Sequence, residues 1–305
     1  MALAGDATMA ARTNIVDVLQ EGTLMLGTMR LTDAGVTSPE AVAALFQTAV
    51  EAGITTIDLA DIYGGYTTER IVGDAFRYRP ELMDELHLVS KCGIVAPVGR
   101  HASARVKHYD TGRHHVETSV EASLDALGAN HLDLLLIHRP DPLMDAEATG
   151  AVLDNLVDDG RVGAVGVSNF RPWDWSLLQS AMDCPLVANQ IELSLSHLDP
   201  FSNGDVAFHQ QHGHAMMAWS PLGGGRVMND AETLGQRLDV LAESNGVDRS
   251  AIAAAFLLHH PSSISPVLGT TSPERLRAVT QATTVKLDTQ DWFWLYEAGL
   301  GSEVP

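Results

Sequence analysis

Four side chains that could exchange protons with a substrate stand at or just beyond the ends of short apolar runs. Asp58 and Tyr63 lie in "TTIDLADIYGGY", Lys91 ends "LHLVSK", and His138 ends "LDLLLIH". A phenol has an ordinary pKa of roughly 10, which is too high for easy proton exchange near neutral pH. An ammonium beside it lowers that pKa, and a carboxylate keeps the ammonium charged and in place. A histidine can orient a carbonyl oxygen or relay a proton. Together the four would give a proton to a carbonyl or remove one from an alcohol.

Each of these residues also has a plainer explanation. Asp58 could cap the following loop, and Tyr63 could pack on a turn. Lys91 could be solvated, and His138 could hydrogen-bond a loop. Acid, phenol, amine and imidazole at three consecutive strand ends nevertheless favour one shared site over four separate roles. The remaining histidines and Cys92 match no zinc-ligand spacing, so we expect no metal.

The elements that must position these residues alternate along the chain. Short runs rich in apolar and β-branched residues predict strands at 23–27, 55–58, 86–91, 132–138, 162–167, 187–191, 215–220 and 264–268. Amphipathic stretches predict helices at 38–52, 67–76, 115–127, 145–159, 172–182, 231–245, 250–260 and 273–280. The segment "LSHLDPFSNG" reads as a loop, and a last amphipathic piece at 289–298 is expected to pack outside the main unit.

This alternation indicates an α/β fold. Strands alternating with helices imply a parallel sheet, and eight such units in roughly 250 residues is the count of a closed (β/α)8 TIM barrel. An open doubly wound sheet is the alternative, which the lack of a G-x-G-x-x-G after the first strand disfavours. We expect one domain over residues 1–305, with a short N-terminal extension and an extra C-terminal helix.

Polar groups recur at the predicted strand ends, where a barrel of this kind places its chemistry. Beyond the first four residues, the strand ends carry Ser168, Asn169, Asn189, Gln190, Trp219 and Ser220. A hydrophobic core does not explain such a series. The pattern therefore predicts a site assembled from several strands.

Four segments closely resemble the aldo-keto reductase superfamily: "TTIDLADIYGGYTTERIVG", "VSKCG", "DLLLIHRPDP" and "VGVSNF". The chain resembles the bacterial branch of uncharacterised oxidoreductases in particular. The resemblance implies a barrel that binds a nicotinamide cofactor, usually NADPH, across its mouth and passes hydride to an aldehyde or ketone. It implies that Tyr63 is the proton donor and that Lys91 and Asp58 lower its pKa. His138 would orient the substrate.

The same resemblance implies a set of cofactor contacts. The expected contacts run from the carboxamide (Ser168, Asn169, Gln190) and the nicotinamide ring (Trp219) to the pyrophosphate (Ser220, Leu222, Gly224) and the 2′-phosphate (Ser272, Arg275). Close approach of backbone to phosphate independently suits the glycines of "SPLGGGR". A serine cap would also aim a helix N-terminus at a phosphate, and an arginine would pair with it.

The chain departs from the family pattern near the 2′-phosphate segment. Gly269 stands where many members have a lysine, and Ala278 and Val279 stand where a glutamate and an asparagine often meet the adenine. The preference for NADPH over NADH therefore rests mainly on Ser272 and Arg275, and NADH stays possible.

The segment after Lys91 and the substrate pocket support weaker expectations. "VAPVGRHASARVKHYDTGRHH" carries Arg100, Arg105, Lys107 and Arg113 in an otherwise acidic chain. It could close over the mouth and attract an anion, although a solvated mobile loop is the favoured interpretation. The substrate pocket is expected to involve Met29, Arg30 and Ile62.

Two classes of function remain open. The first is an NADPH-dependent reductase of a small-molecule carbonyl substrate. The second is an NADPH-binding regulatory or sensor subunit of slow turnover, since potassium-channel β subunits resemble this family too. A metal-dependent barrel hydrolase is weaker, because His138 lacks a second histidine and a carboxylate at ligand spacing.

The amino-acid composition argues against some classes of binding partner. With 19 basic and 39 acidic residues the formal net charge is -20, which argues against nucleic acid and anionic membranes as partners. We expect no signal peptide and no membrane span. Two cysteines form no disulfide framework, so a cytoplasmic location is expected. The sequence contains no signal from which an oligomeric state can be predicted.

Overall fold

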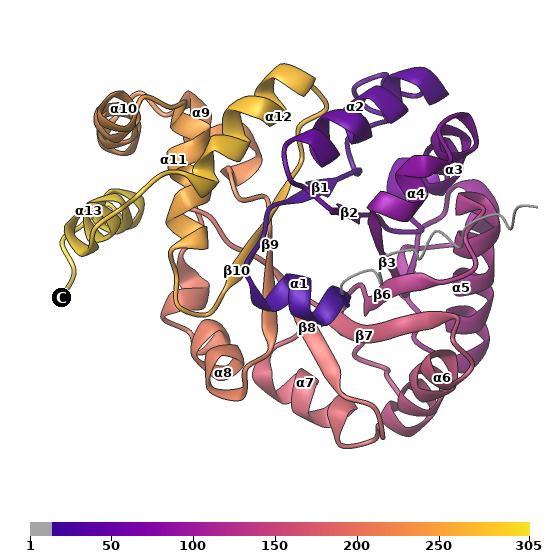
Figure 1. The fold of residues 1–305 in the computed structure, drawn as a ribbon. Helices are drawn as coiled ribbons and strands as arrows, with labels where there is room; N and C mark the ends of the chain where they lie inside the picture. Colours follow the sequence, from indigo (N-terminus) through magenta and orange to yellow (C-terminus); the bar gives the residue numbers. More distant parts are fainter. Residues whose placement is uncertain (1–13) are drawn as a thin grey trace, which may run out of the picture.

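Eight parallel strands close into a barrel in the computed structural model, which describes residues 14–305. Around the barrel the strands follow the order β1-β10-β9-β8-β7-β6-β3-β2 (Figure 1). Their bounds are β1 Met25–Gly27, β2 Thr56–Asp58, β3 His87–Cys92, β6 Leu132–Ile137, β7 Val162–Ser168, β8 Leu186–Glu192, β9 Ala215–Trp219 and β10 Ile264–Leu268. The predicted (β/α)8 barrel is therefore confirmed.

Helices surround the barrel on its outside, except α1, which lies across one opening (Figure 1). They are α1 Ile15–Gln20, α2 Pro39–Glu51, α3 Thr68–Tyr78, α4 Glu81–Glu85, α5 Arg113–Leu127, α6 Ala146–Asp158, α7 Pro172–Gln179, α8 Asp205–His212, α9 Arg226–Asn229, α10 Thr233–Asn245, α11 Arg249–Leu258, α12 Pro273–Thr280 and α13 Thr289–Leu300. The "SPE" signals begin two of them. Ser38 accepts a hydrogen bond from the amide of Ala41, and Ser272 accepts one from Arg275, each at 3.2 Å. A proline follows each serine at the first helical position, where no amide proton is needed.

Two hydrophobic cores hold the barrel together. The larger lies between strands and helices, and the smaller fills the bore with Met25, Val89, Leu134, Met217 and their neighbours. Strands such as β6 are buried on both faces because each face meets one of these cores, which explains the unbroken apolar run. Helix α1 lies across the barrel opening in Figure 1, with its buried residues Ile15 and Leu19 completing the inner core.

Short elements differ from the sequence prediction. Strands β4 (Ile94–Val95) and β5 (His108–Tyr109) pair as a small antiparallel hairpin outside the barrel. Helices α1, α4, α8 and α9 are also additional to the predicted elements. The segment predicted as a loop holds only a single 3-10 turn at Asp199–Phe201, and α8 begins directly after Gly204. These pieces are too short, or in α8 too polar, for a periodic pattern to reveal them.

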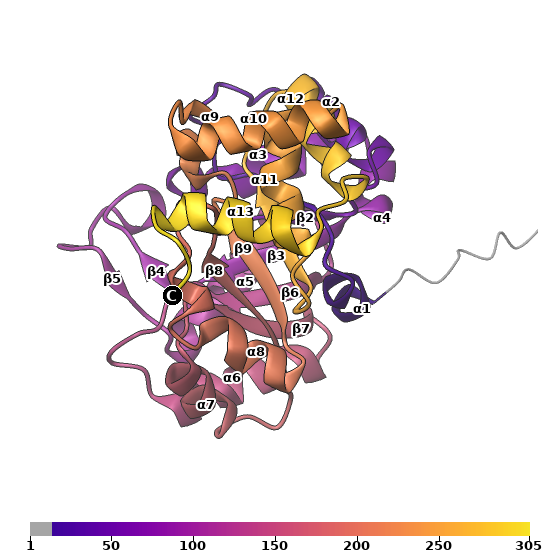
Figure 2. The ribbon, with the colours of Figure 1, turned by 90° about the vertical axis from the view of Figure 1, so that its left-hand side faces the viewer.

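The predicted extra C-terminal helix is α13, which lies outside the barrel against α10 (Figure 2). Its Trp292 stacks on Phe256 of α11, with ring centroids 4.5 Å apart, and its indole donates to the Phe256 carbonyl at 2.9 Å. The predicted N-terminal extension falls largely on residues 1–13, which lie outside the described residues.

Within residues 14–305, no helix combines the length and the apolar character needed to cross a membrane. The expected cytoplasmic location and the absence of nucleic-acid partners stay predictions.

Candidate active site

Three neighbouring strands bring the four proton-exchanging residues together. Asp58 is the last residue of β2, Lys91 lies near the end of β3, and His138 directly follows β6. Parallel pairing of β2 with β3 and of β3 with β6 places these strand ends side by side. Tyr63 reaches the same point from the short 3-10 turn Tyr63–Gly65 that follows β2. The predicted meeting of the four residues is therefore observed.

The Lys91 ammonium is the centre of this group. Its Nζ donates hydrogen bonds to Asp58 Oδ1 at 2.7 Å, to the Leu59 carbonyl at 2.7 Å and to the Tyr63 hydroxyl at 3.1 Å. The Lys91 side chain is fully buried. Burial acts to lower the pKa of Lys91, but the charges of Asp58 and Tyr63 and the hydrogen bonds to them outweigh it, so the pKa is raised. Lys91 is therefore a fixed positive charge beneath the phenol.

The Tyr63 phenol differs from the simplest expectation. Burial raises the pKa of Tyr63 above its ordinary value, and Lys91 offsets that rise only in part. The predicted lowering by Lys91 is thus present, but the loss of solvation outweighs it in the isolated chain. Tyr63 is accordingly protonated at neutral pH, as a proton donor must be.

His138 is neutral for a similar reason. Burial first, and then the positive charges of Lys91 and Arg139, hold the pKa of His138 well below its ordinary range. Its ring meets that of Tyr63 edge to face, with centroids 6.0 Å apart. The buried Nδ1 of His138 has no hydrogen-bond partner among residues 14–305. A neutral imidazole beside a protonated phenol offers two polar groups for one carbonyl oxygen.

A hydrogen-bonded row from β7, β8 and β9 continues the site. Ser168 Oγ donates to the Gln190 carbonyl at 3.0 Å and accepts from the Asn169 amide at 2.8 Å. Asn169 Oδ1 in turn accepts from the indole of Trp219 at 2.9 Å. Asn169 and Ser220 both adopt positive φ, at 61° and 52°. Such backbone strain in non-glycine residues often accompanies a site that needs a side chain aimed in an unusual direction.

Gln190 joins this row to the first four residues. Its amide nitrogen donates to Asp58 Oδ1 at 2.6 Å, the same oxygen that accepts from Lys91. The sequence indicated Gln190 through its place at a predicted strand end and its expected contact with a cofactor, and 132 residues separate it from Asp58. Pairing of side chains so distant in sequence has no local signal.

One cavity of about 960 Å³ extends from these residues along the barrel mouth. Its wall includes nearly all of the predicted site residues, namely Asp58, Tyr63, His138, Ser168, Asn169, Gln190, Trp219, Ser220, Leu222, Gly224 and Arg275. Lys91 lies beneath it. Ser272 is not part of the wall, because its hydroxyl caps α12 and donates to Glu274 Oε2 at 2.7 Å.

Several lining residues carry charge that the sequence did not assign to a cofactor. Arg30 and Asp33 come from the turn after β1, and Arg139 directly follows His138. The Arg139 guanidinium lies 5.8 Å from the centre of the Trp219 ring. The sequence signal for Arg139 was its position directly after His138, a residue at a predicted strand end. Of the residues expected in the substrate pocket, Met29 and Arg30 line the cavity, and Ile62 does not.

The basic segment after Lys91 forms no part of the cavity wall. Arg100 donates to Asp61 Oδ2 at 2.9 Å and lies over the ring of Tyr66, while Arg113 pairs with Glu117 at 3.3 Å. Burial raises the pKa of Asp61 to about 7, although Arg100 opposes the shift. The charge of Arg100 thus serves an internal pair with the buried Asp61, which leaves less of that charge for an external anion.

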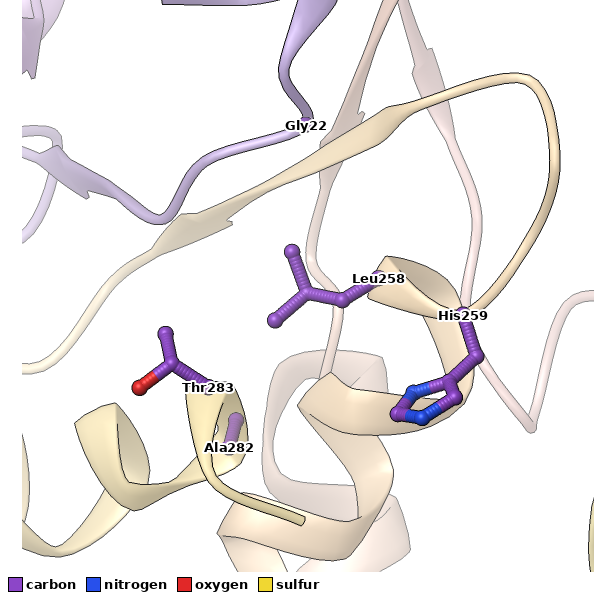
Figure 3. Close-up of a pocket in the computed structure, with 5 residues that line it drawn as sticks. All are labelled: Gly22, Leu258, His259, Ala282 and Thr283. Carbon is purple, nitrogen blue, oxygen red and sulfur yellow. The ribbon is translucent and has the colours of Figure 1, made fainter. Parts of the chain in front are cut away.

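A smaller cavity of about 270 Å³ lies elsewhere, lined by Gly22, Leu258, His259, Ala282 and Thr283. Figure 3 shows Leu258 and Thr283 pointing into the same gap between α11 and the segment 281–283. None of the predicted site residues lines it. Among the described residues, no group of histidines, cysteines and carboxylates is arranged to hold a metal ion.

Comparison with known proteins gives consistent results. The model of the Aldo/keto reductase family matches residues 23–297. A 6-dehydroglucose reductase of Agrobacterium fabrum is 53% identical over 295 residues, which cover 96% of this chain and 99% of that protein. The oxidoreductase YdhF of Escherichia coli is 40% identical, with 92% and 94% covered. An aldo/keto reductase from Klebsiella pneumoniae in complex with NADP and acetate has the same fold, with a TM-score of 0.77, 22% identity and 90% of each chain covered.

Proposed function

Because this chain belongs to the aldo/keto reductase family and is an NAD(P)H-dependent oxidoreductase, we propose that it reduces the aldehyde group of a sugar with NADPH. The observation that carries the proposal is the hydrogen-bonded group of Asp58, Lys91 and Tyr63 at the base of a long polar cavity. The 53% identity to a 6-dehydroglucose reductase makes 6-dehydroglucose, a glucose with an aldehyde at C6, the first candidate substrate. We also infer that residues 1–305 form one domain.

The cofactor, when bound, supplies a hydride to the carbonyl carbon. Tyr63 gives its phenolic proton to the carbonyl oxygen as the C=O electron pair moves onto that oxygen, and the product is an alcohol. Lys91 stabilises the phenolate left on Tyr63, and Asp58 keeps Lys91 charged and placed. A positioned general acid of this kind contributes about 10²- to 10⁴-fold to the rate.

Neutral His138 holds the carbonyl oxygen in line by donating a hydrogen bond. Its low pKa suits this role, because a neutral imidazole can donate a hydrogen bond without placing a second positive charge near Lys91. Orientation of the reacting oxygen removes part of the entropic barrier to reaction.

Cofactor binding follows the wall of the cavity. Ser168, Asn169 and Gln190 would hold the carboxamide, and Trp219 would stack on the nicotinamide. The backbone at Ser220, Leu222 and Gly224 would receive the pyrophosphate. Gly224 and Gly225 have positive φ of 67° and 101°, and a side chain at 225 would meet open space, so bare backbone faces the cleft.

The adenosine 2′-phosphate would lie near Arg275, which lines the cavity. Ser272 contributes by capping α12, whose N-terminus carries partial positive charge. NADPH is the preferred cofactor in this proposal, with NADH possible. The bound dinucleotide leaves the region around Tyr63, His138 and Arg139 for the substrate, and Arg139 offers donors to sugar hydroxyls.

NADPH consumption by the purified protein tests the proposal. The substrates are 6-dehydroglucose, glyceraldehyde and butanal, each repeated with NADH. We expect turnover with 6-dehydroglucose in NADPH and loss of at least about 100-fold in Tyr63→Phe, with NADPH affinity kept. Tyr78→Phe is the matched control, because Tyr78 is 53% exposed and is not part of the cavity wall.

Unchanged turnover in Tyr63→Phe would remove the proton-donor role. Oxidation of bound NADPH that stays extremely slow with every aldehyde would instead favour the regulatory subunit of slow turnover. No feature of the cavity favours that alternative, since Lys91 donates to both Asp58 and Tyr63 and the His138 ring meets that of Tyr63 edge to face.

A further inference from the structure

Arg30 lies where the cofactor cleft lacks an expected cation. Position 269 is a glycine in this chain, although many resembling proteins have a lysine there. A Cβ built on Gly269 would meet the Arg30 side chain, with Cδ and Nε at 3.8 Å, and one built on Gly224 would lie 3.8 Å from Arg30 Nη2. The Arg30 side chain therefore bridges the glycine loop after β9 and the end of β10.

The backbone of Arg30 is held firmly. Thr28, two residues earlier, donates to the Asp58 carbonyl through its amide at 3.0 Å and through its hydroxyl at 2.9 Å. Leu31, the next residue, is fully buried, and its amide donates to the Thr28 carbonyl at 3.1 Å. The turn after β1 thus presents Arg30 at a fixed place on the wall of the cavity.

The guanidinium of Arg30 makes no ion pair or hydrogen bond with the described part of the chain. Among residues 14–305, no carboxylate oxygen lies within 4.0 Å of it, and it makes no hydrogen bond. Arg100, Arg171 and Arg249 by contrast are each paired with an aspartate. An arginine left unpaired on a cavity wall, in a chain with a net charge of -20, is suited to an anionic ligand.

We propose that Arg30 binds a phosphate of the dinucleotide cofactor and supplies the positive charge that position 269 lacks. The inference rests on the proposed NADPH binding. The phosphate would lie beside the planar guanidinium and over the backbone of Gly225, where a Cβ would meet no atom within 4 Å. Arg30 was expected in the substrate pocket, and the structure assigns it to the cofactor end of the cavity instead.

Equilibrium binding of NADPH and NADH, measured by the quenching of tryptophan fluorescence and by calorimetry, tests the inference without any turnover. Arg30→Met should raise the Kd of NADPH about 10- to 100-fold, the value of a charge-assisted hydrogen bond. An equal loss for NADH assigns Arg30 to the pyrophosphate, and a loss confined to NADPH assigns it to the 2′-phosphate. Arg30→Lys, which keeps the charge and loses the planar fork, should lie between wild type and Arg30→Met.

A rescue variant and a control sharpen this test. Gly269→Lys in the Arg30→Met background returns a cation to the vacated space and should recover much of the affinity. Arg105→Met removes the same charge outside the cavity wall and should leave the Kd within about twofold. An unchanged Kd in Arg30→Met, or an equal loss in Arg105→Met, overturns the inference.

The failure of this inference and that of the proposed function are distinguishable. Wild-type protein that binds NADPH through Arg30 but reduces no aldehyde would remove the function and keep the inference. Active wild-type protein with Arg30-independent binding would do the opposite. Thermal melting of each variant verifies folding, and little change is expected because Arg30 makes no hydrogen bond or ion pair within residues 14–305.

Discussion

Lys91 carries a positive charge into a fully buried position, and its surroundings explain why the fold accommodates it. An ammonium has three protons to donate, and Lys91 has three acceptors in Asp58, Leu59 and Tyr63. An isolated buried charge would be strongly destabilising, whereas a fully hydrogen-bonded pair recovers much of that loss. The same three bonds fix the phenol of Tyr63 in one position, so stability and geometry at this site have one origin.

Removal of Lys91 should therefore affect stability and turnover differently. Lys91→Met leaves Asp58 as an unpaired buried carboxylate, which should cost about 3–5 kcal/mol in the free energy of unfolding. Adding Asp58→Asn removes the stranded charge and should restore most of that stability, while turnover stays reduced by about 100-fold or more. Urea unfolding and kcat of the single and double variants measure both effects. A double variant no more stable than Lys91→Met would contradict this account.

The sequence indicated the members of the site better than their contacts. Position at a strand end was enough to predict Asp58, Lys91 and His138 as site residues, because in a parallel barrel the carboxyl ends of all strands meet at one mouth. The bond from Gln190 to Asp58 and the placement of Arg30 depend on side-chain directions across the barrel. No spacing in the sequence encodes those directions.

At the scale of elements, the segment between β3 and α5 is held by polar contacts as well as by the buried side chains of Ile94 and Val95. Arg100 bonds Asp61 and covers the ring of Tyr66, whose hydroxyl donates to the Ile94 carbonyl at 3.1 Å and accepts from the Ala96 amide at 2.9 Å. These contacts tie the β4–β5 hairpin to the turn after β2. The pairing of Arg100 with Asp61 thus explains part of the basic character of this segment.

Arg100→Met should loosen this segment. Loss of the pair with Asp61 removes one of the ties of residues 93–112, so their amide hydrogen exchange should rise about tenfold or more, while strands β2, β3 and β6 stay protected. Hydrogen exchange followed by mass spectrometry measures the change. Arg113→Met, which breaks only a partly exposed pair on α5, is the control. Equal exchange in the two variants would show that Arg100 does not anchor the segment.

The alternation of strands and helices was predictable, whereas the short additions were not. A strand such as β6 is apolar throughout because both of its faces are covered, and this signal survives without knowledge of the fold. The strands of the β4–β5 hairpin have two residues each, and α8 has three consecutive apolar residues followed by four polar ones, with no continuous apolar face. Tertiary contacts stabilise these elements, and local periodicity does not reveal them.

For the whole molecule, the buried carboxyl of Asp61 should make stability depend on pH. Its folded pKa is raised from 3.8 to about 7, so between these values the folded chain keeps a proton that the unfolded chain releases. Stability from this group is therefore full below about pH 4 and is lost as pH rises toward 7. Above about pH 7 the contribution is constant.

Asp61→Asn should remove this dependence. Relative to wild type, the variant should gain up to about 1.4 kcal/mol in unfolding free energy for each pH unit between 5 and 7, and nothing further above 8. Urea unfolding at pH 5, 6, 7 and 8 provides the measurement. Asp125→Asn serves as control, since its side chain is 79% exposed. A difference between Asp61→Asn and wild type that is the same at every pH would contradict the raised pKa.

Helix α1 gives the barrel one closed end and one open end. In Figure 2 it lies at the opposite side of the molecule from the β4–β5 hairpin, which stands at the mouth. The molecule therefore has a back opposite the cavity that the predicted site residues line. Tethering it to a solid support through exposed positions on that back, for example Glu21, would orient every copy with its mouth toward the solution. An oriented layer of this kind would let substrate reach each copy equally, which random attachment through surface lysines does not.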